Sequence, residues 1–262
     1  LELGDAAGVV VAGSRAYVTR GGLGLAVVDV RVPDRPQRLG AVDMKGGAVA
    51  LAVEGTLAYV LERREGRGDP GVPPGALQIV DLENPANPRF LGEILMNRAA
   101  VGFVEVVGIA ASGGFVCVAS WGWTDVDPTD RSTLTVIDVR DPARPREVGT
   151  HRINGRVADV GMSGNTVVWA VTDVSTATRR TTVELVDITD PTSPTRAGAV
   201  TSSGDEAHDL AWAGNIVGVA KSRSTGTAVV ELIDVGDPVA PRRVGTLTVS
   251  KPSGMEGGIY NH

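Results

Sequence analysis

The chain has 262 residues, enough for one large domain with a sizeable core or for two small domains. It carries 25 Lys and Arg against 31 Asp and Glu, a formal net charge of −6, which argues against a protein that binds nucleic acid by neutralising phosphates. Because hydrophobic residues make up 42% of the chain and charged residues 21%, the composition also excludes an intrinsically disordered chain.

In chain order, the first unit of the sequence contains four short apolar segments. They are Val9–Val11, Ala16–Val18, Leu25–Val30, and a fourth that runs from Pro36 past Gly40. Such runs, rich in Val and bounded by Gly, Pro and Asp, predict short β-strands. The third strand carries an aspartate between two apolar residues and is followed by two prolines.

The same four segments recur in four further units, so the chain is built from five repeats. The aspartates of the third strands are Asp29, Asp81, Asp138, Asp187 and Asp234, and the glycines between the first and second strands are Gly13, Gly55, Gly113, Gly164 and Gly214. A residue that recurs in all units is explained most simply by the fold, so we expect each aspartate to cap the turn that follows it.

Four strands per unit and a period of about 50 residues predict an all-β fold, a β-propeller of four-stranded antiparallel blades. The whole chain, residues 1–262, is predicted to be a single propeller domain with five complete blades. The predicted units are residues 5–45, 46–97, 98–153, 154–203 and 204–250, and residues 251–262 are the start of a further blade or a closing segment. A five-bladed ring is one prediction, and a ring of six or seven blades, with blades outside this sequence, is the alternative.

The third strands also resemble a known family. The strings Leu25-Ala26-Val27-Val28-Asp29-Val30 and Leu134-Thr135-Val136-Ile137-Asp138-Val139 are similar to LVIVD repeats. This resemblance implies a β-propeller from a bacterial or archaeal protein that is secreted, periplasmic or exposed on the cell surface, and it brings no catalytic motif. Cys117, the single cysteine, lies within an apolar strand and is interpreted as a core residue.

Two long loops, Glu62 to Ala76 and Ser120 to Ser132, connect the second and third strands of adjacent units. Long loops on a rigid scaffold usually carry function, and these two are expected on one face of the propeller. Trp121 and Trp123 in one loop, with Arg63 in the other, are therefore predicted to bind a sugar ring or a peptide. The alternative is that the tryptophans only cover the end of a blade.

Asp125, Asp127 and Asp130 follow these tryptophans at a spacing that concentrates the oxygen ligands preferred by Ca²⁺. The loop lacks the central glycine and terminal glutamate of an EF-hand, so a solvated acidic loop is the alternative. No cofactor other than this Ca²⁺ is predicted.

His208 begins the first strand of the fifth unit, next to Asp205 and Glu206, and is a candidate for ligand binding. These three residues could also form an acid–base or metal cluster at the mouth of the channel, and they are the only catalytic candidates. An ordinary surface histidine is the alternative. Sequence templates for hydrolases and phosphate-binding loops are absent from the chain.

The sequence favours a non-enzymatic binding or assembly module that engages a protein or a glycan through its loop face. One alternative is a propeller hydrolase or lyase, and another is a structural subunit of a larger surface assembly. No nucleic-acid partner is predicted. No transmembrane segment is predicted either, because Ser112-Gly113-Gly114 interrupts the uncharged stretch Val106 to Trp123.

Overall fold

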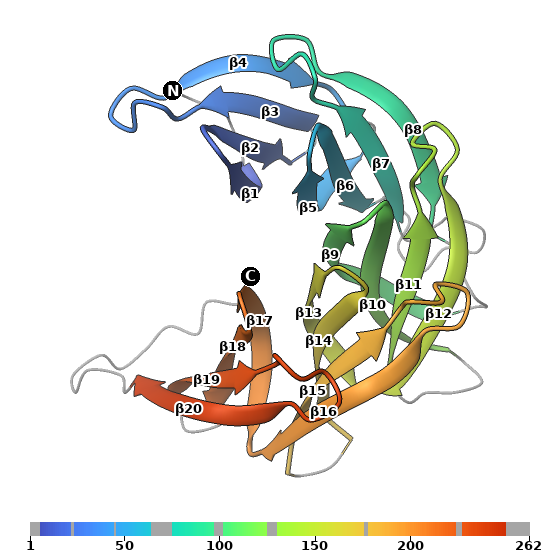
Figure 1. The fold of residues 1–262 in the computed structure, drawn as a ribbon, viewed down its shortest axis with the longest axis vertical. Coiled ribbons are helices and arrows are strands. Elements are labelled where there is room, and N and C mark those ends of the chain that lie inside the picture. Colours follow the sequence, from blue (N-terminus) through green and yellow to red (C-terminus); the bar gives the residue numbers. More distant parts are fainter. Residues whose placement is uncertain are drawn as a thin grey trace.

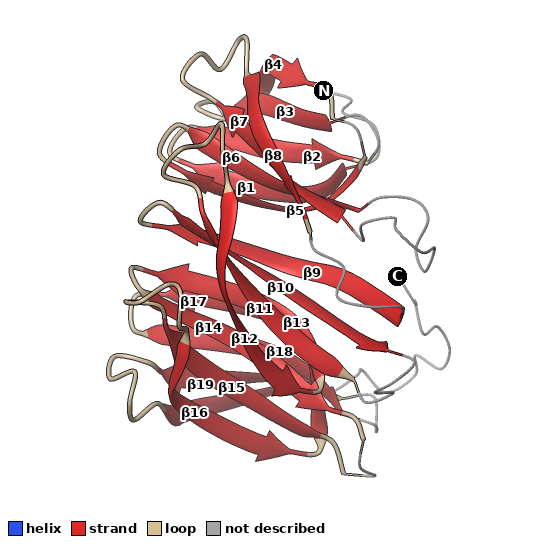
Figure 2. Cartoon of the chain, turned by 90° about the vertical axis from the view of Figure 1, so that its right-hand side faces the viewer, coloured by secondary structure: helices blue, strands red, loops and turns tan. Residues whose placement is uncertain are grey.

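A computed structural model describes residues 6–21, 24–44, 46–63, 75–96, 102–124, 130–175, 178–223 and 227–249. These residues form five four-stranded antiparallel sheets, each made of four strands that are consecutive in the chain. Within these ranges no residue is helical, and no helix could cross a membrane (Figure 2). The all-β class and the four-stranded antiparallel units predicted from the sequence are therefore confirmed.

The strand bounds follow the repeat. The first sheet has β1 (Ala6–Ala12), β2 (Arg15–Arg20), β3 (Gly24–Asp29) and β4 (Gln37–Val42), and the second has β5 (Gly47–Glu54), β6 (Leu57–Arg63), β7 (Gly75–Asp81) and β8 (Arg89–Leu95). The third sheet has β9 (Gly102–Ser112), β10 (Phe115–Thr124), β11 (Arg131–Asp138) and β12 (Arg146–Asn154). The fourth has β13 (Arg156–Ser163), β14 (Thr166–Asp173), β15 (Arg180–Asp187) and β16 (Thr195–Ser203), and the fifth has β17 (Asp205–Ala213), β18 (Ile216–Arg223), β19 (Ala228–Asp234) and β20 (Arg242–Val249).

The five sheets follow one another around an arc (Figure 1). The first strand of each sheet lies on the inner side and the fourth strand on the outer side. Along the inner side, β1 contacts β5, β5 contacts β9, β9 contacts β13 and β13 contacts β17. In Figure 1 the described strands of the first sheet and those of the fifth sheet are separated by a gap.

The repeated aspartates cap the turns that follow the third strands, as predicted. In every sheet the carboxylate oxygen Oδ1 accepts a hydrogen bond from the backbone N–H two residues later. The bonds join Asp29 to Arg31 at 2.9 Å, Asp81 to Glu83 at 2.9 Å, Asp138 to Arg140 at 3.1 Å, Asp187 to Thr189 at 2.8 Å and Asp234 to Gly236 at 3.0 Å. Five identical local bonds indicate a structural role for these acids.

A glycine in each fourth strand sets how closely the next sheet can approach. A Cβ atom on Gly40 would lie 2.5 Å from the carbonyl oxygen of Pro85, in the turn of the second sheet. Gly92 and Pro142, Gly149 and Pro191, and Gly198 and Pro238 repeat this arrangement at 2.5, 2.2 and 2.5 Å. Because no side chain fits at these distances, the four glycines let neighbouring sheets pack with their backbones in contact.

The hydrophobic core lies between the sheets. One cluster joins Tyr17, Leu25 and Val27 of the first sheet to Ala58, Val60, Val80 and Leu82 of the second. Three larger clusters join the second sheet to the third, the third to the fourth and the fourth to the fifth. Cys117 lies in one of these clusters, where burial raises the pKa of its thiol to about 12, so it is a core residue.

Gly198 and Gly245 provide a matched test of the contact between sheets. We predict that Gly198→Ala destabilises the fold by about 1–3 kcal/mol, because the new methyl group would overlap the backbone of the next sheet. Gly245→Ala should be nearly neutral, because its Cβ would meet only Leu232 at 3.5 Å, an ordinary contact. Chemical denaturation measures both changes, and equal losses in the two variants would contradict this account.

Candidate functional site

Trp121, at the end of β10, is half-buried and stacks on a residue from the next sheet. The guanidinium carbon of Arg156 lies 4.6 Å from the centre of the Trp121 ring. The same Arg156 donates from Nε to Oδ2 of Asp130 at 2.8 Å, and Asp130 accepts a backbone hydrogen bond from Gly155 at 2.8 Å. Trp121 and Asp130 are thus linked through Arg156, and together they join the third sheet to the fourth.

The other residues predicted in the two long loops lie at the margin of the described structure. Arg63 ends β6 and Trp123 lies in β10, but their side chains are outside the described residues, as are Asp125 and Asp127. The ligand-binding role of Arg63 and Trp123 and the Ca²⁺ site therefore stay predictions. Within the described ranges, no three His, Cys, Asp or Glu side chains are grouped as metal ligands.

Asp205, Glu206 and His208 all lie in β17, but each is engaged differently. Asp205 is buried, and Glu206 forms an ion pair with Arg179 of the fourth sheet. His208 is exposed, and its Nε2 lies 2.5 Å from Oγ of Ser222 on β18. Glu206 and His208 are thus held by different partners, Arg179 and Ser222.

Two carboxyl groups, Asp159 of β13 and Asp209 of β17, lie side by side on the inner strands. Each accepts a hydrogen bond from the next backbone N–H, Val160 and Leu210, at 2.8 Å. Burial raises the pKa of Asp159 to about 6, and the neighbouring charge of Asp209 also raises it, against backbone hydrogen bonds that lower it. Asp159 therefore titrates close to neutral pH, unlike the turn-capping aspartates.

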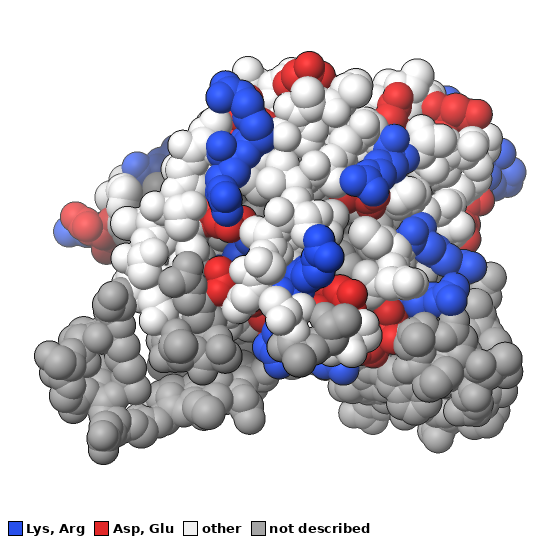
Figure 3. Space-filling view, turned by 90° about the horizontal axis from the view of Figure 1, so that it is seen from below, with Lys and Arg blue, Asp and Glu red and all other residues white. Residues whose placement is uncertain are grey.

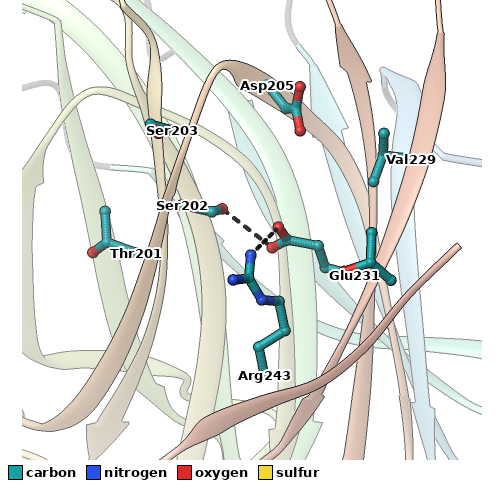
Figure 4. A pocket seen from close by; sticks show the side chains of 8 residues that line it. Thr201, Ser202, Ser203, Asp205, Val229, Glu231 and Arg243 are labelled. Carbon is teal, nitrogen blue, oxygen red and sulfur yellow. Dashed lines mark hydrogen bonds and ion pairs between the residues drawn. The ribbon is translucent and has the colours of Figure 1, made fainter. Parts of the chain in front are cut away.

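A polar cleft of about 490 Å³ lies between the fourth and fifth sheets (Figure 4). Its walls come from the end of β16, the start of β17 and the strands β19 and β20. Its lining includes the side chains of Ser202, Ser203, Asp205, Glu231, Arg243 and Thr246. Hydroxyl groups, two carboxylates and a guanidinium thus face one space, an arrangement suited to a ligand with many hydroxyl groups.

Glu231 is the buried anchor of this cleft. Its Oε2 accepts hydrogen bonds from Nζ of Lys221 at 2.5 Å and from Oγ of Ser202 at 3.1 Å, and its Oε1 accepts from Arg243 at 3.2 Å. Burial disfavours the charge of Glu231, but the hydrogen bonds from Lys221 and its other partners outweigh burial and hold its pKa below the usual value. Glu231 therefore stays ionised with a fully enclosed lysine beside it.

Lys221 and Glu231 were not among the predicted site residues, although the repeat carries a signal for Glu231. Three residues before the repeated aspartate, the units have Ala26, Gln78, Thr135, Glu184 and Glu231. A charged residue inside an apolar third strand predicts a buried polar partner. Glu184 has one as well, since it accepts from Nε1 of Trp169 at 2.7 Å and lies 3.2 Å from Nε2 of His151.

A second hollow, of about 650 Å³, lies over the turn of the third sheet and is lined by Asp138, Asp141, Arg140, Arg144 and Arg146. Asp138 forms ion pairs with Arg140 at 2.7 Å and Arg146 at 2.9 Å, and the Arg140 hydrogen bond contributes most to lowering its pKa. The same kind of pair joins Asp81 to Arg89 and Asp234 to Arg242. This hollow therefore belongs to the repeated turn structure.

Charged groups are mixed rather than segregated on the side of the molecule seen in Figure 3, where Lys and Arg lie beside Asp and Glu. Exposed pairs of this kind contribute little to stability. Among the described residues on this side, Lys and Arg form no continuous stripe of the kind that follows a phosphate backbone.

The chain is similar to one known repeat family and to solved structures. The LVIVD repeat model matches residues 3–43 and 105–152, parts of the first and third sheets. No curated protein matches the chain. A crystal structure of the computationally designed Ika4 protein is similar with 13% sequence identity and a TM-score of 0.43, over 65% of this chain and 87% of that one.

The raised pKa of Asp159 predicts how stability depends on pH. The folded pKa of about 6 lies above the ordinary value of 3.8, so the folded state binds the proton more tightly. The resulting stabilisation is present below about pH 4 and is lost as the pH rises through 6. Asp159→Asn should remove the destabilisation that accompanies ionisation of Asp159, and so raise the free energy of unfolding above pH 6 by about 1–3 kcal/mol. Chemical denaturation of wild type and Asp159→Asn from pH 4 to 7.5 measures this difference in stability, and Glu147→Gln, at an exposed position, is the control. If Asp159→Asn has the same pH dependence of stability as wild type, the raised pKa of Asp159 is contradicted.

The Lys221–Glu231 pair predicts a non-additive double mutant. Lys221→Met should cost about 3 kcal/mol, because it leaves Glu231 buried with only its weaker partners. Glu231→Leu added to Lys221→Met should recover most of that loss, since no buried charge then lacks its counter-ion. Urea denaturation of the single and double variants measures this coupling. Additive losses would show that the pair is not coupled as described.

Proposed function

We propose that this LVIVD-repeat protein is a non-enzymatic binding module. It is a β-propeller that engages a glycan beside its loop face. The observation that carries the proposal is the polar cleft between the fourth and fifth sheets. It lies where the repeated apolar contact between sheets is replaced by hydroxyl groups and buried charges. Its volume of about 490 Å³ is at the small end of the range found for small-molecule sites.

The chemistry of the cleft favours a polyhydroxylated ligand. Ligand hydroxyl groups can donate to the carboxylates of Asp205 and Glu231 and accept from the guanidinium of Arg243. Glu231 is already held by Lys221 and Ser202, so its position is fixed before a ligand arrives. Preorganised polar groups reduce the ordering cost of binding.

The enzymatic alternative has less support. A hydrolase or lyase needs an acid and a base that share one substrate position. Here Glu206 is paired with Arg179, His208 lies beside Ser222, and Asp205 is buried at the cleft. Glu206 and His208 therefore have separate partners. Location outside the cytoplasm, whether extracellular, periplasmic or on the cell surface, is part of the proposal and rests on the family resemblance.

Binding to an array of immobilised mono- and oligosaccharides tests the proposal. We expect a subset of glycans to bind wild type, and the double variant Ser203→Ala, Thr246→Val to lose at least tenfold in affinity for them. Both hydroxyl groups line the cleft, and neither belongs to the Lys221–Glu231 pair. The melting temperature should stay within a degree or two of wild type, since surface substitutions change stability little.

Thr195→Val is the matched control, because Thr195 is an exposed threonine at the other end of β16 and does not line the cleft. Equal glycan binding by the double variant and wild type would exclude the cleft as the site. Capture of a protein but no glycan would point to the protein-binding form of the module, and turnover lost in His208→Ala at unchanged stability would favour the enzyme.

A further inference from the structure

The turn between β11 and β12 of the third sheet gathers three arginines around one hollow. Arg140, Arg144 and Arg146 lie two, six and eight residues after the repeated aspartate. The hollow has a volume of about 650 Å³, and Asp138 and Asp141 complete its lining. Because three guanidinium groups face two carboxylates, this hollow has a positive formal charge on a chain whose formal net charge is −6.

The turn itself does not require this set of arginines. All five units form the turn with the same aspartate cap, but the third unit alone has arginine at all three positions. The residues at these positions in the other four units are Arg31, Arg35 and Gln37; Glu83, Asn87 and Arg89; Thr189, Ser193 and Thr195; and Gly236, Ala240 and Arg242. The arginine cluster is therefore a departure from the repeat, and it gives the third unit a property that the others lack.

The buried carboxylate of Asp138 holds two of the three guanidinium groups in place. Arg140 donates to it from Nε at 2.9 Å and from Nη2 at 2.7 Å, and Arg146 donates from Nε at 3.3 Å and from Nη2 at 2.9 Å. The guanidinium carbon of Arg140 also lies 5.2 Å from the centre of the Phe115 ring. A guanidinium carries five N–H donors on three nitrogens, so both groups keep donors for a ligand. Their fixed positions reduce the ordering cost of binding.

Arg144 supplies the third guanidinium from the turn itself. Its backbone N–H donates to the carbonyl oxygen of Asp141 at 3.0 Å, and its side chain is exposed at the hollow. The Asp141 side chain also caps this turn, since its Oδ1 accepts from the backbone N–H of Ala143 at 3.2 Å. Asn84 makes the equivalent bond to Ala86 in the second sheet at 3.1 Å, so the cap needs an oxygen atom but no charge.

We infer that this hollow binds a sulfate or phosphate ester group carried by a small polar molecule such as a sugar. Such a tetrahedral group has three terminal oxygens, which suits donors from three separate arginines, whereas a carboxylate has only two oxygens. The volume lies within the range of small-molecule sites, so the hollow has room for the molecule that carries the ester. Different residues line the cleft between the fourth and fifth sheets, and the inference does not depend on glycan binding there.

Isothermal titration calorimetry at low ionic strength tests the inference, because salt screens exposed charges. The probes are a galactose sulfate, the matching galactose phosphate, galactose itself, galacturonate and inorganic sulfate. We expect one of the two esters or both to bind wild type with millimolar affinity, and galactose and galacturonate to bind far more weakly at this hollow. The ester with the higher affinity identifies whether the bound group is sulfate or phosphate.

Arg144→Gln should weaken ester binding by about fivefold or more, because it removes one of the three charged donors. Arg35→Gln is the matched control, since Arg35 is the exposed arginine at the same position of the first unit, where Gln37 stands in place of the third arginine. It should leave ester affinity unchanged. Both variants should melt within a degree or two of wild type, because surface substitutions change stability little.

Asp141→Asn should have the opposite effect and strengthen ester binding by about threefold. The substitution removes the carboxylate that repels an anion and keeps the oxygen that caps the turn, as Asn84 does in the second sheet. An increase in affinity cannot arise from a damaged fold, so this variant separates a direct charge effect from loss of structure.

Four results would overturn the inference. Neither ester binds the folded protein, or both bind Arg144→Gln as tightly as wild type, which would place the anion elsewhere. Galacturonate binds as tightly as the esters, which would show that the hollow accepts any anion. Inorganic sulfate binds but neither ester does, which would show that the hollow holds a free ion and excludes the molecule that carries the group.

Discussion

The contact between a fourth-strand glycine and the proline turn of the following sheet is the constraint on which the rest of the structure depends. A four-stranded sheet with both faces apolar cannot bury them alone, so each unit needs a neighbour on either side. The glycine removes the side chain that would hold the sheets apart, with backbone atoms 2.2 to 2.5 Å from where its Cβ would be. The apolar residues on either side of the glycine then reach the next sheet and complete the core.

The repeated parts of the fold were predicted well from the sequence, because each recurring residue has the same local structural role in all five units. The aspartates of the third strands cap their turns, and Cys117 lies in the core as its apolar neighbours indicated. The curvature of the arc could not be read from the sequence, since it depends on the angle between packed sheets rather than on any local pattern.

The candidate site was predicted less well, for a physical reason. Asp205 was identified through its neighbours His208 and Glu206, yet it lines the cleft with Glu231 and Arg243, which come from other strands. Lys221 lies in an ordinary strand position, and its role depends on Glu231 and on Ser202 of the preceding sheet. Contacts between units are not encoded by sequence proximity, so only a departure from the repeat, such as a glutamate inside an apolar strand, could have indicated them.

Departures from the repeat explain how a scaffold of equivalent sheets can form a local polar cleft. At the fourth-strand position of Met44 and Met96, the fourth sheet has Ser202, which faces Glu231 and Lys221 of the fifth sheet. Two sheets that elsewhere meet through apolar side chains meet here through hydroxyl and charged groups, and the cleft opens between them.

Amide hydrogen exchange along the whole chain tests this view of neighbouring sheets most directly. We predict that β16, one face of which packs against the fifth sheet, exchanges far more slowly than β20, although both are the last strands of their sheets. We also predict slower exchange in β5 than in β1. Equal protection of β16 and β20 would contradict the claim that each sheet is held by the sheet beside it.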